Sequence, residues 1–417
     1  MNILVLNAGS SSHKLCLYAI GEELPNDPPP PLWQAQIDWY PDDESATLTV
    51  EAQTGQQNKT ITGQSQAEVL REVLASLHQG PTAVIDGLEE IALVGHRVVH
   101  GGDRYQSSVV VDEEVKGAIA DLSALAPLHN PANLNGIELM ESLLGDVPQV
   151  AVFDTAFHHT LSDTAATYPG PYQWKAQGIR RYGFHGISHQ FCSHQAARIL
   201  GKDLLEFRLV VCHLGNGASL TAVKNGQSID TTMGFTPLEG VMMGTRCGSI
   251  DPGILMYLLD QGHDLADVDR LLNKESGLKG LSGVSHDLRE VQQAISQGNS
   301  QAKLAFDVYI HRLKSCLGSM IMSLEGLDGL VFTAGLGEHS PELRSRVCQG
   351  LKFLSLTLDE EKNQRSPRNA DISADDSAVR VLVIHTQEDW AIAQEAWRCI
   401  PVDHPVAKKI PINSGSL

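Results

Sequence analysis

The stretch ILVLNAGSSSHKLCLYAI, residues 3–20, predicts two short strands joined by a tight polar turn. Apolar residues fill both ends, while the middle holds Asn7, Gly9, three serines and Lys14. A hairpin needs the glycine, but it does not need an amide, three hydroxyls and an ammonium group in one turn. Hydroxyls, backbone N–H groups and a lysine together suit a phosphate, although a plain serine-rich turn explains the same pattern.

The stretch LVVCHLGNGASLTAVKNG, residues 209–226, repeats this plan about one domain length later. Both stretches read as an apolar strand, a turn rich in glycine and small polar residues, and a second strand. Duplication of the chain, with two polar hairpin tips facing one cleft, explains the repeat, and two unrelated hairpins are the alternative. The 417 residues leave room for two or three domains.

The rest of the chain alternates strand and helix patterns, which predicts an α/β architecture. Residues 21–50 carry the proline-rich PNDPPPP, and we expect an exposed insertion there because proline removes sheet donors. The other predicted elements are strands within 91–102, 149–158 and 207–226, a strand with a glycine turn and a helix start within 329–340, a strand followed by a helix within 379–390, and helices over 66–79, 132–144, Ser188–Leu200, 252–262 and 301–323.

Charge and cysteine usage exclude several classes of protein. The formal net charge of −19 repels nucleic acids and anionic membranes, and no basic cluster offsets it. Seven scattered cysteines without a C-x-x-C pair indicate reduced thiols in the cytoplasm. The N-terminal apolar run lacks a preceding basic segment, and no apolar stretch is long enough to span a membrane.

Two further glycine turns follow predicted strands, in HLGNGAS (213–219) and AGLGEHS (334–340). Each turn can offer backbone N–H groups to a phosphate, but neither matches G-x-G-x-x-G, and the chain has no Walker loop. One such turn is ordinary. Three turns at strand ends favour a nucleotide.

Two arginines stand where packing gives little reason for them. Arg97 interrupts the apolar run of GHRVVHGG, and Arg246 lies in the glycine-rich MMGTRCGSIDPG. A buried guanidinium must be paired, so a structural ion pair is one reading. The other is a pair of guanidinium groups that hold a small anion and the phosphoryl group being transferred to it.

Histidines and carboxylates supply the remaining candidates. The histidine spacings fit no metal motif, but His185 and His129 can donate to phosphoryl oxygens. Asp154 ends the strand AVFDTAFH, where it is a catalytic carboxylate or a helix cap. Glu388 is a dipole carboxylate or a magnesium ligand with Asn7, and the second reading requires the C-terminus to fold back onto the N-terminal domain.

These segments together resemble the acetokinase family. The matching segments occur in order from residue 2 to about 398: VLNAGSSSHK, HRVVHGG, PLHNP, FDTAFH, RRYGFHGISH, HLGNGAS, DTTMGFTPLEGVMMGTR, FTAGLGEHS and TQED. The resemblance implies two ribonuclease-H-like, actin/sugar-kinase-like domains around a nucleotide cleft. It also implies the reaction ATP + acetate ⇌ ADP + acetyl phosphate, with Mg²⁺ or Mn²⁺, in a cytoplasmic homodimer.

The resemblance assigns roles to domains and residues. Residues 1–154 with 386–417 would form the acyl and magnesium side, and residues 155–385 the nucleotide-binding domain. The implied catalytic residues are Asp154, His185 and Arg246, and the implied magnesium ligands are Asn7 and Glu388. The implied acetate-site residues are Arg97, Val99, Leu128, His129 and Pro237. The implied nucleotide-binding residues are Ser10, Ser12, Lys14, His213, Leu214, Gly215, Asn216, Gly217, Asp287, Leu288, Arg289, Gly335, Leu336, Gly337, Glu338 and His339.

Chemistry modifies one of these roles. Acetate is already ionised near pH 7 and needs no base, so we expect Asp154 mainly to orient Arg246 or the ion. The chain also departs from the family pattern at His13, Ser249 and His339, and it has TQED in place of TNEE.

Three alternatives stay open. A propionate or butyrate kinase would use the same residues, because one methylene changes binding by only about 1–3 kcal/mol. Pyrophosphate is an alternative phosphoryl donor. An actin-like protein that binds nucleotide without turnover needs none of Arg97, Asp154, His185 and Arg246, and a G-x-S-x-G hydrolase motif is absent.

Overall fold

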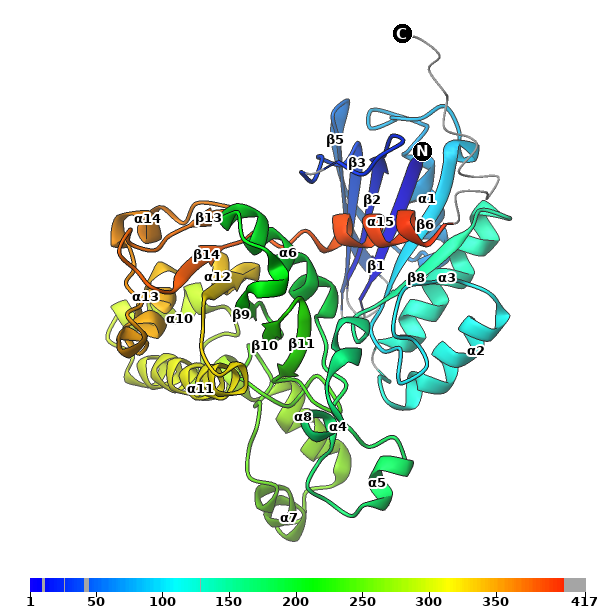
Figure 1. The fold of residues 1–417 in the computed structure, drawn as a ribbon. Coiled ribbons are helices and arrows are strands. Elements are labelled where there is room, and N and C mark those ends of the chain that lie inside the picture. Colours follow the sequence, from blue (N-terminus) through cyan, green and yellow to red (C-terminus); the bar gives the residue numbers. More distant parts are fainter. Residues whose placement is uncertain (10–11, 26, 41–44, 128, 401–417) are drawn as a thin grey trace. The chain divides into compact units, whose positions relative to one another are not determined.

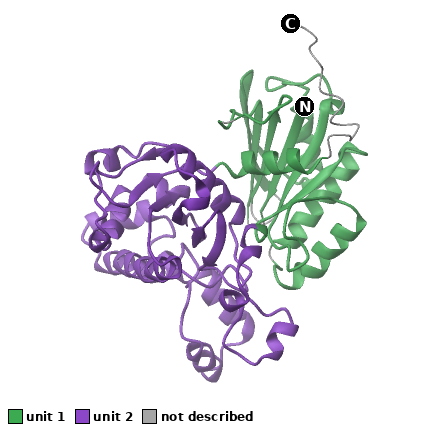
Figure 2. Cartoon of the chain, in the orientation of Figure 1, with its two compact units in different colours: residues 1–156, 387–417 green, residues 157–386 purple. Residues whose placement is uncertain are grey.

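The chain folds into two compact units, each described here by itself (Figure 2). Unit 1 comprises residues 1–156 and 387–417, and unit 2 comprises residues 157–386. The computed structural model describes residues 1–9, 12–25, 27–40, 45–127 and 129–400.

Unit 1 is built on one eight-stranded sheet with the order β5-β4-β3-β2-β1-β6-β8-β7. Its strands are β1 (Asn2–Ala8), β2 (Ser12–Ala19), β3 (Trp33–Trp39), β4 (Ser45–Ala52), β5 (Gly55–Thr62), β6 (Ile91–Val98), β7 (Val109–Val110) and β8 (Gln149–Phe153). Its α-helices are α1 (Gln66–Ala75), α2 (Glu113–Asp121), α3 (Asn130–Leu144) and α15 (Glu388–Cys399).

The first hairpin forms as its sequence predicts. Strands β1 and β2 pair antiparallel, with Asn7 opposite Lys14, and Gly9 N–H donates to the carbonyl of Ser12 at 2.8 Å. Strand β1 is parallel to β6, and β6 is parallel to β8. The carboxyl ends of these three strands therefore share one edge of the sheet, where ligands bind in open α/β sheets.

The prediction of an exposed insertion over residues 21–50 is wrong for its second half. Strands β3 and β4 extend the sheet antiparallel, and their inward side chains, Trp33, Ile37, Leu48 and Val50 among them, are buried. The cluster PNDPPPP lies before β3, so the prolines remove no donor from the sheet. The alternating pattern of WQAQIDW was the overlooked signal.

Helix α15 returns the C-terminal segment to unit 1, where Figure 1 shows it (red) lying across the strands. Its close approach depends on Gly95 of β6, because a Cβ there would lie 2.9 Å from Ile392 Cγ2 and 3.2 Å from Ala396 Cβ. A magnesium site formed by Asn7 and Glu388 requires the chain to return to the N-terminal domain in this way, as expected from the sequence.

Unit 2 has a six-stranded sheet with the order β11-β10-β9-β12-β14-β13. Its strands are β9 (Arg208–Leu214), β10 (Ala218–Lys224), β11 (Gln227–Thr231), β12 (Gly329–Thr333), β13 (Ala370–Asp371) and β14 (Arg380–Val383). Its α-helices are α4 (Asp163–Ala166), α5 (Gln173–Ala176), α6 (Gly186–Leu200), α7 (Gly253–Asp260), α8 (Leu265–Lys274), α9 (Gly277–Ser282), α10 (Leu288–Ser296), α11 (Ser300–Leu324), α12 (Ala334–His339), α13 (Pro341–Gln349) and α14 (Glu360–Arg365).

The two sheets share one topology, which confirms the predicted repeat. The run β3-β2-β1-β6-β8 in unit 1 corresponds to β11-β10-β9-β12-β14 in unit 2. In both runs the middle strand, β1 or β9, pairs antiparallel with β2 or β10 on one side and parallel with β6 or β12 on the other. The hairpin tips also correspond, since Gly215 N–H donates to the carbonyl of Gly217 at 3.0 Å.

Two boundaries in unit 2 differ from the sequence-based expectation. Helix α6 begins at Gly186, two residues before the predicted start, and Ser188 is a buried residue of its first turn. His185 takes the N-cap position in the left-handed region, with φ 58°. Strand β12 passes directly into α12 at Thr333, without the glycine turn expected there.

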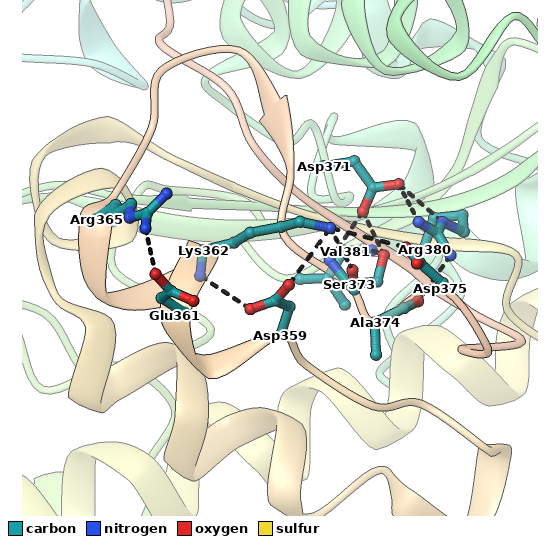
Figure 3. Close-up of polar contacts among 10 residues, drawn as sticks. All are labelled: Asp359, Glu361, Lys362, Arg365, Asp371, Ser373, Ala374, Asp375, Arg380 and Val381. Carbon is teal, nitrogen blue, oxygen red and sulfur yellow. Dashed lines mark hydrogen bonds and ion pairs between the residues drawn. The ribbon is translucent and has the colours of Figure 1, made fainter.

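An ionic network stabilises the outer edge of the unit 2 sheet (Figure 3). Arg380 donates through Nε and Nη2 to Oδ2 of Asp371, at 2.8 and 2.5 Å, and through Nη1 to the carbonyl of Ala374. Lys362 pairs with Asp359 at 3.4 Å. The Arg380–Asp371 contacts fix β13 against β14, and the Lys362–Asp359 pair supports the first turn of α14.

None of the seven cysteines, all of which lie in described segments, forms a disulfide. Among the described helices, none combines the length and the apolar character that crossing a bilayer requires.

Candidate functional site

Arg97 and Asp154 meet at the carboxyl edge of the unit 1 sheet. Arg97 is the penultimate residue of β6, and it donates through Nε (3.0 Å) and Nη2 (2.5 Å) to Oδ2 of Asp154, which follows β8. Its Nη1 donates to Asn7 Oδ1 at 3.2 Å. Burial alone would lower the pKa of Arg97, but Asp154 and Glu388 raise it above its ordinary value. The guanidinium is therefore fixed in orientation and charged.

Glu388 joins the same group of side chains from the first turn of α15. Burial raises the pKa of its carboxyl group, while the charges of Arg97 and Lys14 oppose that rise. A carboxylate held in this way gains from a nearby cation. Lys14, opposite Asn7 in the first hairpin, is exposed, and Ser12 is half-buried.

Two asparagines of α3 support this edge, and sequence reasoning missed them. Asn133 accepts from Val99 N–H (3.0 Å) and donates to the carbonyl of Ala8 (2.7 Å), which ties the ends of β6 and β1 together. Asn130 similarly bonds both backbone groups of His100. The sequence signal that could have found them is a pair of asparagines spaced one helical turn apart, in a helix that comes after a buried strand along the chain.

Val99 is buried beside this support, and His129 precedes α3 at its N-cap position. The predicted residues Ser10 and Leu128 lie outside the described residues.

In unit 2, His185 lies between the first turn of α6 and the hairpin of β9 and β10. Its Nδ1 is 2.9 Å from Ser219 Oγ, and its ring stacks on that of His213 with centroids 4.2 Å apart. Its left-handed backbone is uncommon for a residue other than glycine. Strained positions of this kind cluster at functional sites.

Arg246 reaches the glycine turn between β9 and β10. A Cβ on Gly217 would lie 3.5 Å from Arg246 Nη1 and 3.4 Å from His185 Nε2, so both donors border the same point. Arg246 Nη1 also donates to the carbonyl of Pro237 at 3.4 Å. Burial lowers the pKa of this guanidinium, and within the described chain no carboxylate forms an ion pair with it. The positive charge of Arg246 is therefore available to bind an anion.

The other glycine-rich segments gather around this turn. A Cβ on Gly215 would lie 3.7 Å from Ala334 Cβ at the start of α12, and Gly244 N–H donates to the carbonyl of Asn216 at 3.0 Å. The loop before α10 also approaches, since a Cβ on Gly244 would lie 3.3 Å from His286 Cβ. Unit 2 therefore brings together the segments that contain most of the predicted nucleotide-binding residues.

Within these segments the side chains differ in exposure. Along α12, Gly335 and His339 are exposed, Leu336 is half-buried, and Gly337 and Glu338 are buried.

The Glu338 side chain is buried, and its described contacts are with the segment that follows β14. Its carboxylate lies 2.7 Å from His385 Nδ1 and accepts from Thr386 N–H. These contacts hold α12 against that segment.

At the start of α10, Asp287 caps the helix and pairs with Arg289 at 2.5 Å, while Leu288 is buried. Among the nucleotide-turn residues, His213 and Leu214 are buried, and Asn216 is exposed.

The donor set at Asn7 and Glu388 fits a magnesium ion shared with a substrate. No group of three or more metal-binding side chains occurs in the part of the chain that the structure describes, so protein ligands alone do not form a cage. Mg²⁺ commonly uses one or two protein oxygens and completes its shell with water and substrate phosphates. The half-buried carboxyl group of Glu388 has the chemistry that such a ligand needs.

Comparison with known proteins identifies the family of this chain. A sequence model described as the acetokinase family matches residues 2–394. The chain belongs to the acetokinase family. An acetate kinase of Acaryochloris marina is 64% identical over 397 residues, which cover 95% of this chain and 99% of that protein.

Solved structures of the acetokinase fold agree closely with the chain. The crystal structure of Porphyromonas gingivalis acetate kinase superposes with a TM-score of 0.87 at 39% identity, over 96% of this chain and 100% of that one. A propionate kinase from Francisella tularensis gives 0.86 at 38% identity, over the same shares. The predicted two-domain, actin/sugar-kinase-like α/β fold is therefore confirmed.

Two of the departures from the acetokinase pattern have local explanations. His13 is buried and packs edge-on against Trp39 of β3, with ring centroids 5.9 Å apart, and burial lowers its pKa to about 4. Ser249 accepts from Gly240 N–H at 3.0 Å through its hydroxyl. Both residues therefore act through packing or loop structure. His339 is exposed at the end of α12, and nothing in the structure explains its substitution.

Proposed function

We propose that this chain is an acetate kinase, which reversibly transfers the γ-phosphoryl group of ATP to acetate and yields acetyl phosphate and ADP. The observation that carries the proposal is the half-buried Arg246 guanidinium beside His185 and Gly217, which lacks a carboxylate partner among the described residues, in a member of the acetokinase family. A desolvated cation beside a glycine turn suits the charge of a phosphoryl group in transfer.

The proposed chemistry is a direct in-line displacement. A carboxylate oxygen of acetate forms a bond to the γ-phosphorus, the bond from that phosphorus to the bridging oxygen of ADP breaks, and ADP leaves. We assign acetate binding to Arg97, whose guanidinium is charged and fixed in orientation. Asp154 keeps Arg97 oriented, which revises our expectation that it orients Arg246 or the ion. Arg246 and His185 stabilise the developing charge.

The two units supply different parts of this reaction. Unit 1 is the proposed acyl and magnesium side, with Asn7 and Glu388 as ligands of Mg²⁺, or of Mn²⁺ in its place. When bound, that ion would neutralise phosphate charge. Unit 2 is the proposed nucleotide-binding domain, through the turns at 213–217, 287–289 and 335–339. Lys14 and the serine turn of unit 1 would contact the phosphates.

Membership of the acetokinase family supports the proposed acceptor and assembly. Val99, Leu128 and Pro237 would surround the methyl group of acetate. Propionate is the second candidate acceptor. The propionate kinase from Francisella tularensis resembles this chain as closely as the Porphyromonas gingivalis acetate kinase does. We also propose a cytoplasmic homodimer.

A hydroxamate assay tests the function. Purified protein with ATP, Mg²⁺ and acetate is expected to form acetyl phosphate, which hydroxylamine traps. Propionate and butyrate replace acetate in parallel assays, and pyrophosphate replaces ATP. Binding of ATP without any acyl hydroxamate would instead favour a nucleotide-binding protein without turnover, and a higher kcat/KM for butyrate or propionate would overturn the choice of acetate.

A further inference from the structure

A single hydroxyl group lies between two histidine rings in unit 2. Ser219 Oγ is 2.9 Å from His185 Nδ1 and 2.7 Å from His189 Nε2. Ser219 belongs to β10 and His189 to α6, and both are completely buried. His185 is the N-cap residue of α6, one turn before His189.

The number of hydrogens on these three groups limits their arrangement. A serine hydroxyl has one hydrogen to donate, and each nitrogen of a neutral imidazole either donates or accepts. In the first arrangement, His189 Nε2–H donates to Ser219 Oγ, and the serine hydroxyl donates to His185 Nδ1. In the second arrangement both bonds run the other way. A third, in which both rings donate to Oγ, would leave the hydrogen of the buried hydroxyl without an acceptor, since the two histidines are the described contacts of that oxygen.

The other ring nitrogen of His189 decides between the two arrangements. His189 Nδ1 is buried and has no hydrogen-bond partner in the described segments of the chain. The second arrangement places a hydrogen on Nδ1 and therefore buries an unpaired N–H, which is rare in folded proteins. The first leaves only a lone pair there. A doubly protonated ring is excluded, because burial and the neighbouring His158 and His213 hold the pKa of His189 well below its usual value.

We propose that Ser219 and His189 are positioning residues that fix His185 as the tautomer with its hydrogen on Nε2. This inference rests on the proposed function, in which His185 stabilises charge on the phosphoryl group. His185 Nε2 borders the same point beside Gly217 as Arg246 Nη1. In this tautomer the ring presents an N–H there, whereas the other tautomer would present a lone pair that repels a phosphoryl oxygen.

The position of the ring is held as well as its tautomer. His213 stacks on His185, and His213 Nδ1 is itself 2.8 Å from Ser188 Oγ. Ser188 Oγ lies 2.9 Å from Thr386 Oγ1. The His185 ring is therefore oriented by the Ser219 bond at one nitrogen and supported on one face by a second bonded histidine.

Paired variants separate the hydrogen bond from packing. Ser219→Ala removes the hydroxyl and Ser219→Thr keeps it, while His189→Leu removes the donor and His189→Gln provides an amide N–H in its place. We expect Ser219→Ala and His189→Leu to lower kcat by about 10–100-fold with little change in KM, since the interaction strengthens in the transition state. Ser219→Thr and His189→Gln should retain most of kcat. Full kcat in both Ser219→Ala and His189→Leu would overturn the inference.

A spectroscopic measurement is independent of activity. Long-range ¹H–¹⁵N correlation spectra of the ¹⁵N-histidine-labelled protein distinguish the two tautomers, and the His185 signals are assigned as those missing from His185→Gln. We expect the Nε2–H pattern in the wild type and a mixture of tautomers in Ser219→Ala. An Nδ1–H pattern in the wild type overturns the inference, even if Ser219→Ala fails to fold. Wild-type protein with the Nε2–H pattern but no acyl hydroxamate would instead overturn only the proposed function.

Discussion

Arg97 and Asp154 share one hydrogen-bonded contact in which two guanidinium nitrogens donate to a single carboxylate oxygen, Oδ2, at 3.0 and 2.5 Å. The Asp154 side chain is 1% exposed and that of Arg97 is 19% exposed. The carboxylate is thus inside the fold, and the arginine is partly accessible. This asymmetry is suited to a residue that binds a ligand while a buried acid holds it.

Asp154→Asn is expected to reduce kcat/KM for acetate by about 10–100-fold, because the amide cannot match the charge-assisted contact that orients Arg97. The loss should appear mainly as a higher KM for acetate. The measurement is the initial rate of acetyl hydroxamate formation at varied acetate and saturating ATP.

Asp328→Asn is the matched control for this variant. Asp328 also accepts from Nε and Nη2 of an arginine, Arg208, at 2.9 and 2.6 Å, but about a third of each side chain is exposed. It should leave kcat/KM unchanged. Near-wild-type turnover of Asp154→Asn, with unchanged acetate and magnesium dependence, would rule out the orienting role.

Glu388→Gln is expected to raise the Mg²⁺ concentration for half-maximal activity by more than about tenfold. The neutral amide loses the charge that binds the cation most strongly in a site with few protein ligands. Titration of activity with Mg²⁺ at saturating substrates measures the effect. Asp389→Asn, next to it in α15, is the control, and equal shifts in the two variants would contradict a specific role for Glu388.

The sequence predicted features that depend on local pattern. Both hairpins were recognisable because apolar runs surround a glycine turn, and the segments with specific motifs located His185 and Arg246. Contacts that depend on sheet register were not predictable in the same way. The partnership of Arg97 with Asp154 joins residues 57 positions apart, and it arises because β6 and β8 are parallel neighbours.

The residues that sequence reasoning missed act through buried polar contacts. Asn133 bonds one backbone group at the end of β1 and another just after β6, and Ser219 bonds two histidines. Neither pattern has a motif, since asparagine and serine are common in turns and caps. Their partners were defined only once the sheets had formed. Strand β3 was likewise missed, because the proline cluster outweighed the alternation of apolar and polar residues that follows it.

Arg344 is a buried arginine whose described contacts are all with neutral groups. It donates to the carbonyls of Gly337 and Glu338 at 2.7 and 2.8 Å, and to the side chain and carbonyl of Asn363 at 2.8 and 2.9 Å. Burial lowers its pKa to about 10. Because Gly337 and Glu338 lie in α12, this arginine holds the end of the proposed nucleotide-binding helix.

Arg344→Lys is expected to lower the free energy of unfolding by about 3 kcal/mol and to raise KM for ATP more than KM for acetate. Lysine lacks the planar group that reaches several acceptors at once. Urea unfolding and steady-state kinetics measure the two effects. Arg346→Lys, which alters a half-buried arginine on the same helix, is the control, and an equal effect of both variants on KM for ATP would contradict the assignment.

Helix α7 is apolar around its whole circumference, yet none of its residues is buried within the chain. Met256 and Tyr257 are 65% and 62% exposed. An apolar helix of this kind normally lies inside a protein or an interface. A second copy of the chain, as in the proposed homodimer, would cover it.

Met256→Glu combined with Tyr257→Glu is therefore expected to convert the dimer to a monomer. Charges placed in an apolar contact would lose their hydration without gaining a partner. Light scattering coupled to size-exclusion chromatography measures the mass. Leu205→Glu, which alters an equally exposed leucine on another element, should leave the dimer intact. A dimer that survives the double change would place the interface elsewhere.

His158 makes the stability of the protein depend on pH in a defined direction. Burial lowers its pKa from 6.5 to about 4, although the Phe184 carbonyl, 3.0 Å from Nε2, opposes the shift. Between these two values the unfolded chain binds a proton that the folded chain does not. The free energy of unfolding therefore decreases as the pH falls from 6.5 to 4, by up to about 1.4 kcal/mol per pH unit for this residue.

His158→Gln removes the titrating group and keeps an N–H for the Phe184 carbonyl, so the acid side of the stability profile should become shallower by up to about 1.4 kcal/mol per pH unit. Urea unfolding of wild type and variant at several pH values between 4.5 and 7.5 measures the slopes. His159→Gln, which alters the exposed neighbour, should keep the wild-type slope. The prediction fails if the slopes of the His158→Gln variant and the wild type coincide below pH 6.5, because the buried ring would then titrate alike in the folded and unfolded chains.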